Sequence, residues 1–308
     1  MIAINFFGTH DFAAGILQAL VDSDLFEIGT VFTAPDRPVG RHQEIQKSAV
    51  KILAEKHHLR IEQPASLMNY ELGIKNYELN VVCDYGLIVP KEILNAPKFS
   101  SLNVHPSLLP KYRGASPIQS AILNGEAETG VTIIMMDEKL DHGPILAQKT
   151  VKIEPTDDYN TLSAKLLETA KTLLIDAAQK WVDGQITPQA QDDALATNCR
   201  EFTRDDGRVD FGIMTAAEIY NRWRALTPWP GVWCKIKDKR LKILRVDRQI
   251  RQSKQIRQIK SGEAVIENNQ IMFVCADGNF ITILDLQLEG KKAMTASEFI
   301  NGYKHLLE

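Results

Sequence analysis

The sequence predicts an α/β fold in two parts, an open and mostly parallel sheet followed by a small β-barrel. Two observations carry this prediction. In the first part, apolar runs alternate with stretches of helical apolar spacing, which is typical of strands joined by crossover helices. In the second part, five short β-rich runs follow one another, which is typical of the small barrels that bind oligonucleotides.

The elements of the first part follow from these periodicities. Each expected strand is a short apolar run that ends at polar residues or glycine, and each expected helix repeats apolar side chains at intervals of three and four. The expected strands are Ile2–Phe7, Phe26–Thr33, Asn80–Asp84, Ser101–Val104, Val131–Met136 and Ile145–Ile153, and the last two can pair. The expected helices are Phe12–Val21, Ser48–His57 and Tyr159–Trp181.

A polar stretch separates the two parts. Residues 190–206 are expected to link a first domain, residues 1–189, to a second domain, residues 207–308. The second domain is predicted to begin with a helix, Thr215–Ala225, which two prolines stop, and to end with a helix at Ser297–Leu307. Its strands are expected at Val232–Ile236, Leu241–Val246, Glu263–Ile266, Ile271–Val274 and Phe280–Leu286.

Composition excludes several classes of protein. With 44% hydrophobic and 24% charged residues, the chain has the balance of a soluble globular protein of two domains. We expect no membrane association and a cytoplasmic location, because no apolar run is long enough to span a bilayer and the start lacks a basic leader. The four cysteines are scattered without zinc spacing, so we expect reduced thiols and no metal.

The charge is unevenly distributed along the chain. Residues 207–308 carry 17 basic and 11 acidic side chains, whereas residues 1–206 carry 19 and 28. Within residues 235–260 there are 11 basic side chains against two acidic ones. Lys235, Lys237 and Lys239 alternate, so on one strand they would form a single positive face. This pattern favours attraction to a polyanion such as a phosphate backbone, although it carries no base specificity.

One cluster is typical of a reaction centre. Asn103 and His105 lie two residues apart at the end of an expected strand, so both face one side at the edge where parallel sheets bind ligands. Asp141 follows in a predicted turn, and its neighbour His142 is expected to point elsewhere. An amide that donates to a developing oxyanion, an imidazole that moves protons and a carboxylate that orients it suit acyl transfer to an amine.

Two further segments are less specific. Gly8-Thr9 follows the first expected strand, but the segment lacks the Gly-x-Gly-x-x-Gly pattern, which disfavours dinucleotide binding. The loop Leu108–Gly114 is either a plain surface loop or a wall of the substrate site. In the second case Arg113 would attract an anion or brace the loop.

Several motifs together resemble one family over nearly the whole chain. The matching segments include Pro35–Pro38, Tyr85–Ile88, Asn103–Pro110, Arg113–Ala115, Pro228–Pro230 and Gly290–Met294. On these segments the sequence resembles the methionyl-tRNA formyltransferase family. The resemblance implies a Rossmann-like formyltransferase fold with an oligonucleotide-binding-like barrel, and transfer of a formyl group from 10-formyltetrahydrofolate to the amino group of methionyl initiator tRNA.

The resemblance also implies roles for particular residues, without a metal and in a monomer. Asn103, His105 and Asp141 would be catalytic, with Asp141 governing the tautomer and charge of His105. The residues implied for folate binding are Tyr85, Gly86, Leu87, Ile88, Val89, Pro90, Ser107, Leu108, Leu109, Pro110 and Gly143. Those implied for tRNA binding are Arg41, Lys235, Lys237, Lys239, Arg240 and Lys242.

Two departures from the family pattern leave questions open. The segment Gly40–Ala49 lacks the two lysines and two prolines usual after the Gly-Arg pair, which would weaken or alter contact with the acceptor stem. Asp84 replaces a small apolar residue, and would either bind the pterin or face solvent. The alternative functions are a formyltransferase for an amino sugar nucleotide, which would not need the basic stretch, and a non-catalytic RNA-binding protein.

Overall fold

A computed structural model describes residues 1–39, 43–68, 77–247, 251–252 and 259–307. The chain forms two compact units and passes between them more than once. The first unit comprises Met1–Pro117, Glu128–Lys152 and Ser163–Cys199, and the second comprises Ile118–Ala127, Ile153–Leu162 and Arg200–Glu308. Two segments that precede the expected linker thus belong to the second unit, and the sequence-based limits at 189 and 207 stay a prediction.

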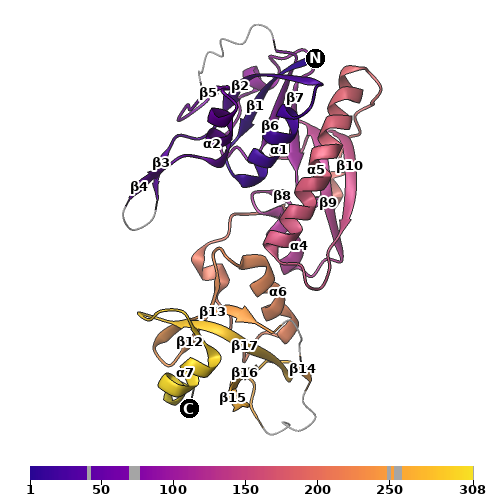
Figure 1. The fold of residues 1–308 in the computed structure, drawn as a ribbon. Coiled ribbons are helices and arrows are strands. Elements are labelled where there is room, and N and C mark those ends of the chain that lie inside the picture. Colours follow the sequence, from indigo (N-terminus) through magenta and orange to yellow (C-terminus); the bar gives the residue numbers. More distant parts are fainter. Residues whose placement is uncertain (40–42, 69–76, 248–250, 253–258, 308) are drawn as a thin grey trace. The chain divides into compact units, whose positions relative to one another are not determined.

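The first unit is built on a seven-stranded sheet in the order β10-β9-β7-β6-β1-β2-β5 (Figure 1). Its strands are β1 (Ile2–Gly8), β2 (Phe26–Phe32), β5 (Arg60–Glu62), β6 (Leu79–Cys83), β7 (Ser101–His105), β9 (Glu128–Met135) and β10 (Ile145–Lys152). The five strands from β7 to β5 are parallel, and β9 and β10 run antiparallel to their neighbours. The predicted open, mostly parallel sheet is therefore confirmed, including the pairing of the last two strands.

Helices cover this sheet because their apolar stripes face it. They are α1 (Asp11–Val21), α2 (Ala49–Lys56), α3 (Lys91–Leu94) and α5 (Tyr159–Val182). Helix α4 (Pro117–Leu123) belongs, except for its first residue, to the second unit. Gly15 of α1 lies against Leu167 of α5, where an added Cβ would come within 2.6 Å of the leucine side chain. The two helices therefore pack directly on each other. In the described parts of the chain, no helix is both long and apolar enough to span a membrane.

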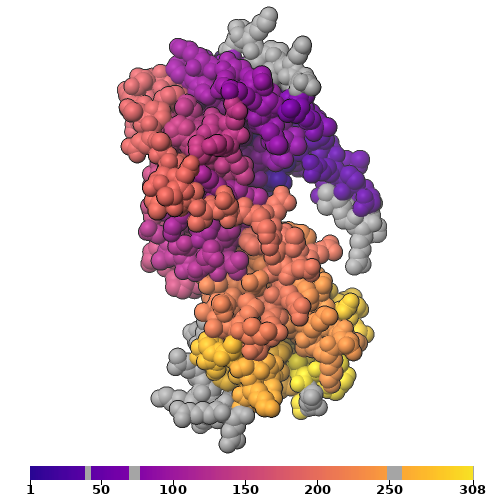
Figure 2. Space-filling view, turned by 180° about the vertical axis from the view of Figure 1, so that it is seen from behind, coloured from indigo at the N-terminus to yellow at the C-terminus, as the bar shows by residue number. Residues whose placement is uncertain are grey.

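A two-stranded hairpin extends from the sheet as an arm (Figures 1 and 2). It consists of β3 (Arg37–Val39) and β4 (Glu44–Gln46), and its base is held by Lys51, whose Nζ lies 2.6 Å from Asp36 and 2.7 Å from Gln63. Sequence periodicity missed this hairpin because its strands are short and polar. Arg41, implied for tRNA binding, lies outside the described residues.

The second unit contains an antiparallel sheet in the order β12-β13-β17-β16-β15, with β14 and β18 also paired to β17. The strands are β12 (Val232–Ile236), β13 (Lys239–Val246), β14 (Arg251–Gln252), β15 (Ala264–Glu267), β16 (Gln270–Val274), β17 (Asn279–Leu288) and β18 (Met294–Thr295). Two helices, α6 (Ala216–Leu226) and α7 (Ala296–Tyr303), each begin with a capping box, Thr215 with Glu218 and Thr295 with Glu298.

The expected single face of alternating lysines is wrong. Lys235 lies on β12 and Lys239 on β13, and Lys237 lies in the turn between them with a φ of +49°. The chain reverses at Lys237 because the two antiparallel strands pair tightly, Ile236 opposite Lys239. A basic face does form, but from other pairs: Lys235 stands opposite Arg240, and Lys242 opposite Trp233.

Candidate active site

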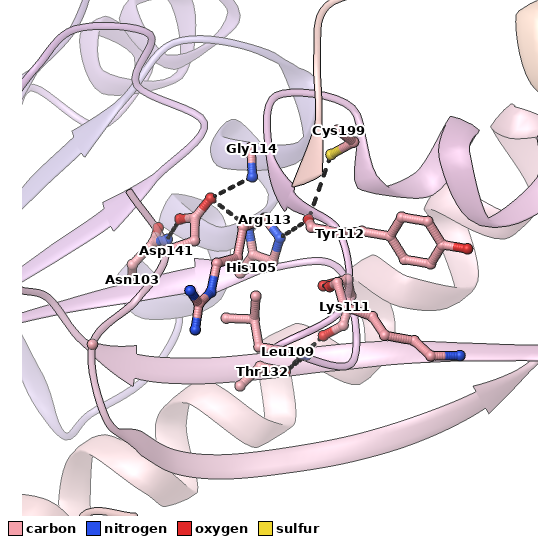
Figure 3. A network of polar contacts seen from close by, with 12 residues as sticks. Asn103, His105, Leu109, Lys111, Tyr112, Arg113, Gly114, Thr132, Asp141 and Cys199 are labelled. Carbon is pink, nitrogen blue, oxygen red and sulfur yellow. Dashed lines mark hydrogen bonds and ion pairs between the residues drawn. The ribbon is translucent and has the colours of Figure 1, made fainter. Parts of the chain in front are cut away.

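The three candidate catalytic side chains meet at the end of β7 (Figure 3). Asn103 and His105 both extend from this strand, and Asp141 reaches them from the turn after β9. The Asn103 amide donates to Asp141 Oδ1 at 3.0 Å, and His105 Nδ1 lies 3.6 Å from Asp141 Oδ2. The His105 and Asp141 side chains are only 6% and 10% exposed, so the Asp141 carboxylate lies in a largely desolvated place.

A backbone carbonyl fixes the tautomer of His105. Its Nε2 lies 2.8 Å from the carbonyl oxygen of Tyr112, which has no proton to give, so Nε2 must be the donor. In the neutral ring Nδ1 is then the unprotonated nitrogen, and it faces the Asp141 carboxylate. The family resemblance implied that Asp141 governs both the tautomer and the charge of His105. The geometry instead gives the tautomer to Tyr112 and leaves Asp141 to stabilise a proton on Nδ1.

Backbone contacts hold Asp141 in an uncommon conformation. Its φ is +47°, a left-handed region that few residues other than glycine adopt. Its Oδ2 accepts from the backbone N–H of Gly114 at 2.8 Å. Gly143, two residues on, leaves no room for a side chain, because an added Cβ would lie 1.8 Å from the carbonyl oxygen of Met135. Gly143 therefore permits the tight turn that presents Asp141.

The segment Ser107–Pro110 is anchored by Thr132 of β9. The Thr132 hydroxyl donates to the Ser107 carbonyl at 2.6 Å and accepts from the Leu109 N–H at 3.2 Å. The Ser107 hydroxyl bonds the Lys111 carbonyl at 2.6 Å. Ser107 and Leu109 are buried, whereas Leu108 and Pro110 are partly exposed. Sequence reasoning missed Thr132, because a lone threonine in a β-rich run gives no signal of its contacts.

The segment Tyr85–Pro90 combines a buried anchor with an open backbone. The Tyr85 side chain is 3% exposed and packs edge-on against Phe7 with ring centroids 5.5 Å apart, so its ring belongs to the core. Leu87 and Val89 pack partly against the same cluster. Ile88 is 83% exposed, and Gly86 has a φ of +78° with no atom within 4 Å of an added Cβ. Backbone and apolar surface are therefore both accessible here.

Arg113 braces the site, because its guanidinium is bonded to neighbouring side chains of the chain itself. Its side chain is only 10% exposed and donates to Gln191 Oε1 from Nε at 3.1 Å and from Nη2 at 2.8 Å. Nη2 also lies 2.8 Å from Asp193 Oδ1, and this pairing with Arg113 lowers the pKa of the Asp193 carboxyl.

His142 points away from the catalytic group, as the sequence predicts, with Nδ1 2.6 Å from Asp137.

Asp84 also has a partner that no sequence pattern indicated. Its Oδ1 lies 2.9 Å from His10 Nδ1, and this hydrogen bond, with the attraction between the two groups, raises the pKa of His10 above 6.5. Both side chains are well exposed. Of the two uses considered for Asp84, the geometry favours a solvent-facing pair with His10 at the edge where β1 and β6 end.

The candidate tRNA-binding cations of the second unit lie on β12, β13 and their turn. Lys235, Lys239 and Lys242 are exposed, and the Arg240 guanidinium lies over the Trp233 ring at 3.9 Å from its centroid. This stacking orders the arginine and leaves its N–H groups for an acceptor. Lys237 bonds the carbonyl of His305 at 2.5 Å, which holds it toward the C-terminal helix.

Two family models match the chain. The "Formyl transferase" model covers residues 1–178, and the "Formyl transferase, C-terminal domain" model covers residues 201–304. A methionyl-tRNA formyltransferase of Caldicellulosiruptor saccharolyticus is 42% identical over 98% of this chain and 97% of its own length. One from Acidobacterium capsulatum is 39% identical over 96% and 95%.

Solved structures share the fold at lower identity. An N-formyltransferase from Helicobacter canadensis, solved with folinic acid and dTDP-3-aminofucose, superposes with a TM-score of 0.68 at 22% identity. The match covers 92% of this chain and 99% of that one. HypX from Aquifex aeolicus, solved with tetrahydrofolic acid, gives a TM-score of 0.64 at 15% identity over 97% of this chain and 47% of that one.

Proposed function

This chain belongs to the methionyl-tRNA formyltransferase family, and we propose that it transfers the formyl group of 10-formyltetrahydrofolate to the amino group of methionyl initiator tRNA. The observation that carries the proposal is the meeting of Asn103, His105 and Asp141 at the end of β7. An amide donor, a proton carrier of fixed tautomer and a buried carboxylate supply what formyl transfer to an amine requires.

Asn103 is assigned to the formyl oxygen. Its amide nitrogen has two hydrogens, and only one is used in the bond to Asp141 Oδ1. The second hydrogen can donate to the formyl oxygen as negative charge develops on it. Because the bond to Asp141 fixes the amide in advance, this donor needs little reorganisation during the reaction.

His105 is assigned to the proton. The attacking amine must lose a proton, and the leaving nitrogen of the folate must gain one. Nδ1 is the free acceptor of the ring, because the Tyr112 carbonyl holds the proton on Nε2. Once Nδ1 is protonated, it lies 3.6 Å from Asp141 Oδ2, which stabilises the imidazolium until it gives the proton up.

The residues at the strand ends fit a folate as the formyl donor. The co-substrate supplies an activated formyl group when it is bound. Gly86 leaves its backbone open to close approach, and Ile88 and Leu87 provide apolar surface for a flat ring. The buried Tyr85 would contribute through its backbone and by anchoring the segment. We propose that Leu108–Pro110 and Gly143 complete the binding segment, and that no metal takes part.

The basic face of the second unit is assigned to the tRNA backbone. Lys235, Arg240 and Lys242 lie on one face of two paired strands, Lys237 lies in the turn between these strands, and Lys239 begins the second strand. Such a face attracts phosphates without reading bases. We propose that a single copy acts in the cytoplasm, and that Arg41 approaches the acceptor end of the tRNA.

The test is direct. The purified protein is incubated with 10-formyltetrahydrofolate and charged methionyl initiator tRNA, and formyl-methionyl-tRNA is measured for the native chain and for Asn103→Ala. We expect product from the native chain and a fall of about 100- to 1,000-fold in the variant, the usual cost of one oxyanion donor. Formylation of an amino sugar nucleotide instead of the tRNA would reject the proposed acceptor.

A further inference from the structure

We propose that Gln191 is a positioning residue of the transfer reaction. It would fix the turn that carries Asp141, and through it the distance between the Asp141 carboxylate and His105. This inference rests on the proposed function, since it concerns the same transfer step. Gln191 lies outside the β-sheet that carries Asn103 and His105, in the polar stretch that the sequence marked only as a linker.

The side-chain amide of Gln191 uses all of its hydrogen-bonding capacity within the site. Its Nε2 donates to the Asp141 carbonyl at 2.9 Å and to the Gly143 carbonyl at 2.8 Å. Its Oε1 accepts both hydrogen bonds from Arg113. Because carbonyls only accept and a guanidinium only donates, the amide has one possible orientation here. Of the ordinary side chains of this length, glutamine alone offers two donors and an acceptor in this arrangement.

Gln191 connects the two backbone segments that hold Asp141 in place. On one side is the strained turn from Asp141 to Gly143, which the amide holds by its carbonyls. On the other side is β8 (Arg113–Gly114), whose Gly114 N–H donates to Asp141 Oδ2. Gln191 thus connects the backbone of the carboxylate's own turn to the strand that fixes its oxygen.

The same segment also holds the carbonyl that sets the histidine tautomer. Residues 198–199 form β11, which pairs in parallel with β8. The Thr197 hydroxyl accepts from the Tyr112 N–H at 2.8 Å, and the Thr197 carbonyl accepts from the Arg113 N–H at 2.8 Å. Tyr112 itself has a φ of +61°. The stretch 191–199 therefore supports both partners of His105, the Asp141 carboxylate and the Tyr112 carbonyl.

Such support is expected to act on the rate of transfer more than on binding. A misplacement of about 1 Å in a catalytic group costs about 100-fold in rate. Loss of the Gln191 amide would release a turn whose left-handed conformation is unfavourable by itself. Most of the proposed substrate contacts would remain, because Tyr85–Pro90, Leu108–Pro110 and the basic face lie outside this turn, and only Gly143 of the proposed folate segment lies within it.

The experiment compares Gln191→Glu with the native chain in single-turnover formylation, with methionyl initiator tRNA and 10-formyltetrahydrofolate each varied while the other is saturating. The glutamate keeps the length and an acceptor for Arg113, but it cannot donate when ionised, so it turns an oxygen toward both carbonyls. We expect the rate to fall about 10- to 100-fold while the half-saturation concentrations of both substrates change by less than about two-fold. Gln185→Glu makes the same chemical change at an exposed position and should keep the native rate.

The outcomes separate the two proposals. A native chain that makes no formyl-methionyl-tRNA rejects the proposed function. An active native chain together with a Gln191→Glu variant at the native rate, or one changed only in half-saturation, rejects the positioning role. If Gln191→Glu does not fold, Gln191→Met decides, because it has a similar size and neither donates nor accepts strongly. Its rate should then fall by a similar factor, and a native rate in this variant would overturn the inference.

Discussion

Replacing Asp141 with asparagine removes one charge and one acceptor and keeps the shape of the side chain. The native carboxylate accepts a hydrogen bond on each oxygen, from the Asn103 amide and from the Gly114 N–H. Asparagine has one oxygen and one NH₂ group. If its NH₂ faces Gly114, two donors meet, and a backbone N–H in a largely desolvated place is left without an acceptor, at a cost of about 1–3 kcal/mol.

The other orientation of the new amide damages catalysis instead. If its NH₂ faces Asn103, the Asn103 amide must turn over to accept, which withdraws the donor assigned to the formyl oxygen. In both cases the proton on His105 Nδ1 loses the carboxylate that lies 3.6 Å away. Loss of an oriented acid–base partner, with or without the oxyanion donor, predicts a fall of about 100- to 10,000-fold in the rate of transfer.

The assay is single-turnover formylation of methionyl initiator tRNA, followed together with unfolding by denaturant. Asp137→Asn is the matched control. Asp137 carries a similar carboxylate on the same loop, but it pairs with His142 and is 37% exposed. We expect this control to stay within about three-fold of the native rate. An Asp141→Asn variant that transferred formyl at a comparable rate would refute the role given to the carboxylate.

Three further predictions concern other parts of the chain. Asp84 raises the pKa of His10 above 6.5, so their pairing stabilises the fold fully below pH 6.5, and this contribution is lost as the pH rises through the higher pKa of the folded state. Denaturant unfolding should therefore show that Asp84→Ala lowers the free energy of unfolding more at pH about 5.5 than at pH about 8.5. Gly143→Ala should lower both stability and transfer rate, because its Cβ would meet the Met135 carbonyl oxygen at 1.8 Å; thermal unfolding and single-turnover rates would show this. Lys242→Glu should weaken tRNA binding and flatten its dependence on salt, and an unchanged salt slope would remove this face from the interface.

Sequence periodicity predicted the elements that pack and missed those that do not. The strands β1 and β6 are buried almost throughout, and β2 and β7 are mostly buried, so the position of these strands along the chain was readable within a residue or two. The β3–β4 hairpin and β11 are short and polar, and their pairing depends on partners that are distant in sequence or on polar contacts. The prediction of a single lysine face around Lys237 was wrong for a related reason, because charge spacing alone does not reveal where the chain reverses between two strands.

In the candidate site, too, residues with a local sequence pattern could be predicted, whereas contacts between residues distant in sequence could not. Asn103 and His105 were readable because they alternate on one strand, and Asp141 because it stands in a turn with glycine. Gln191 lies 50 residues from Asp141, and His10 lies 74 residues from Asp84. Only the folded backbone brings such pairs together. Sequence patterns therefore indicated which side chains meet at the candidate site, but not the side chains that hold them in place.

We propose that His105 and Asp141 act as one unit when this chain formylates methionyl-tRNA. The most direct measurement is the single-turnover rate of formyl-methionyl-tRNA formation by the native chain, His105→Ala, Asp141→Asn and the double variant. We predict a fast reaction of the native chain. The rate of the double variant should lie within about three-fold of the rate of the slower single variant, because each change disables the same proton transfer. A native chain that forms no product, or losses that multiply in the double variant, would contradict the account.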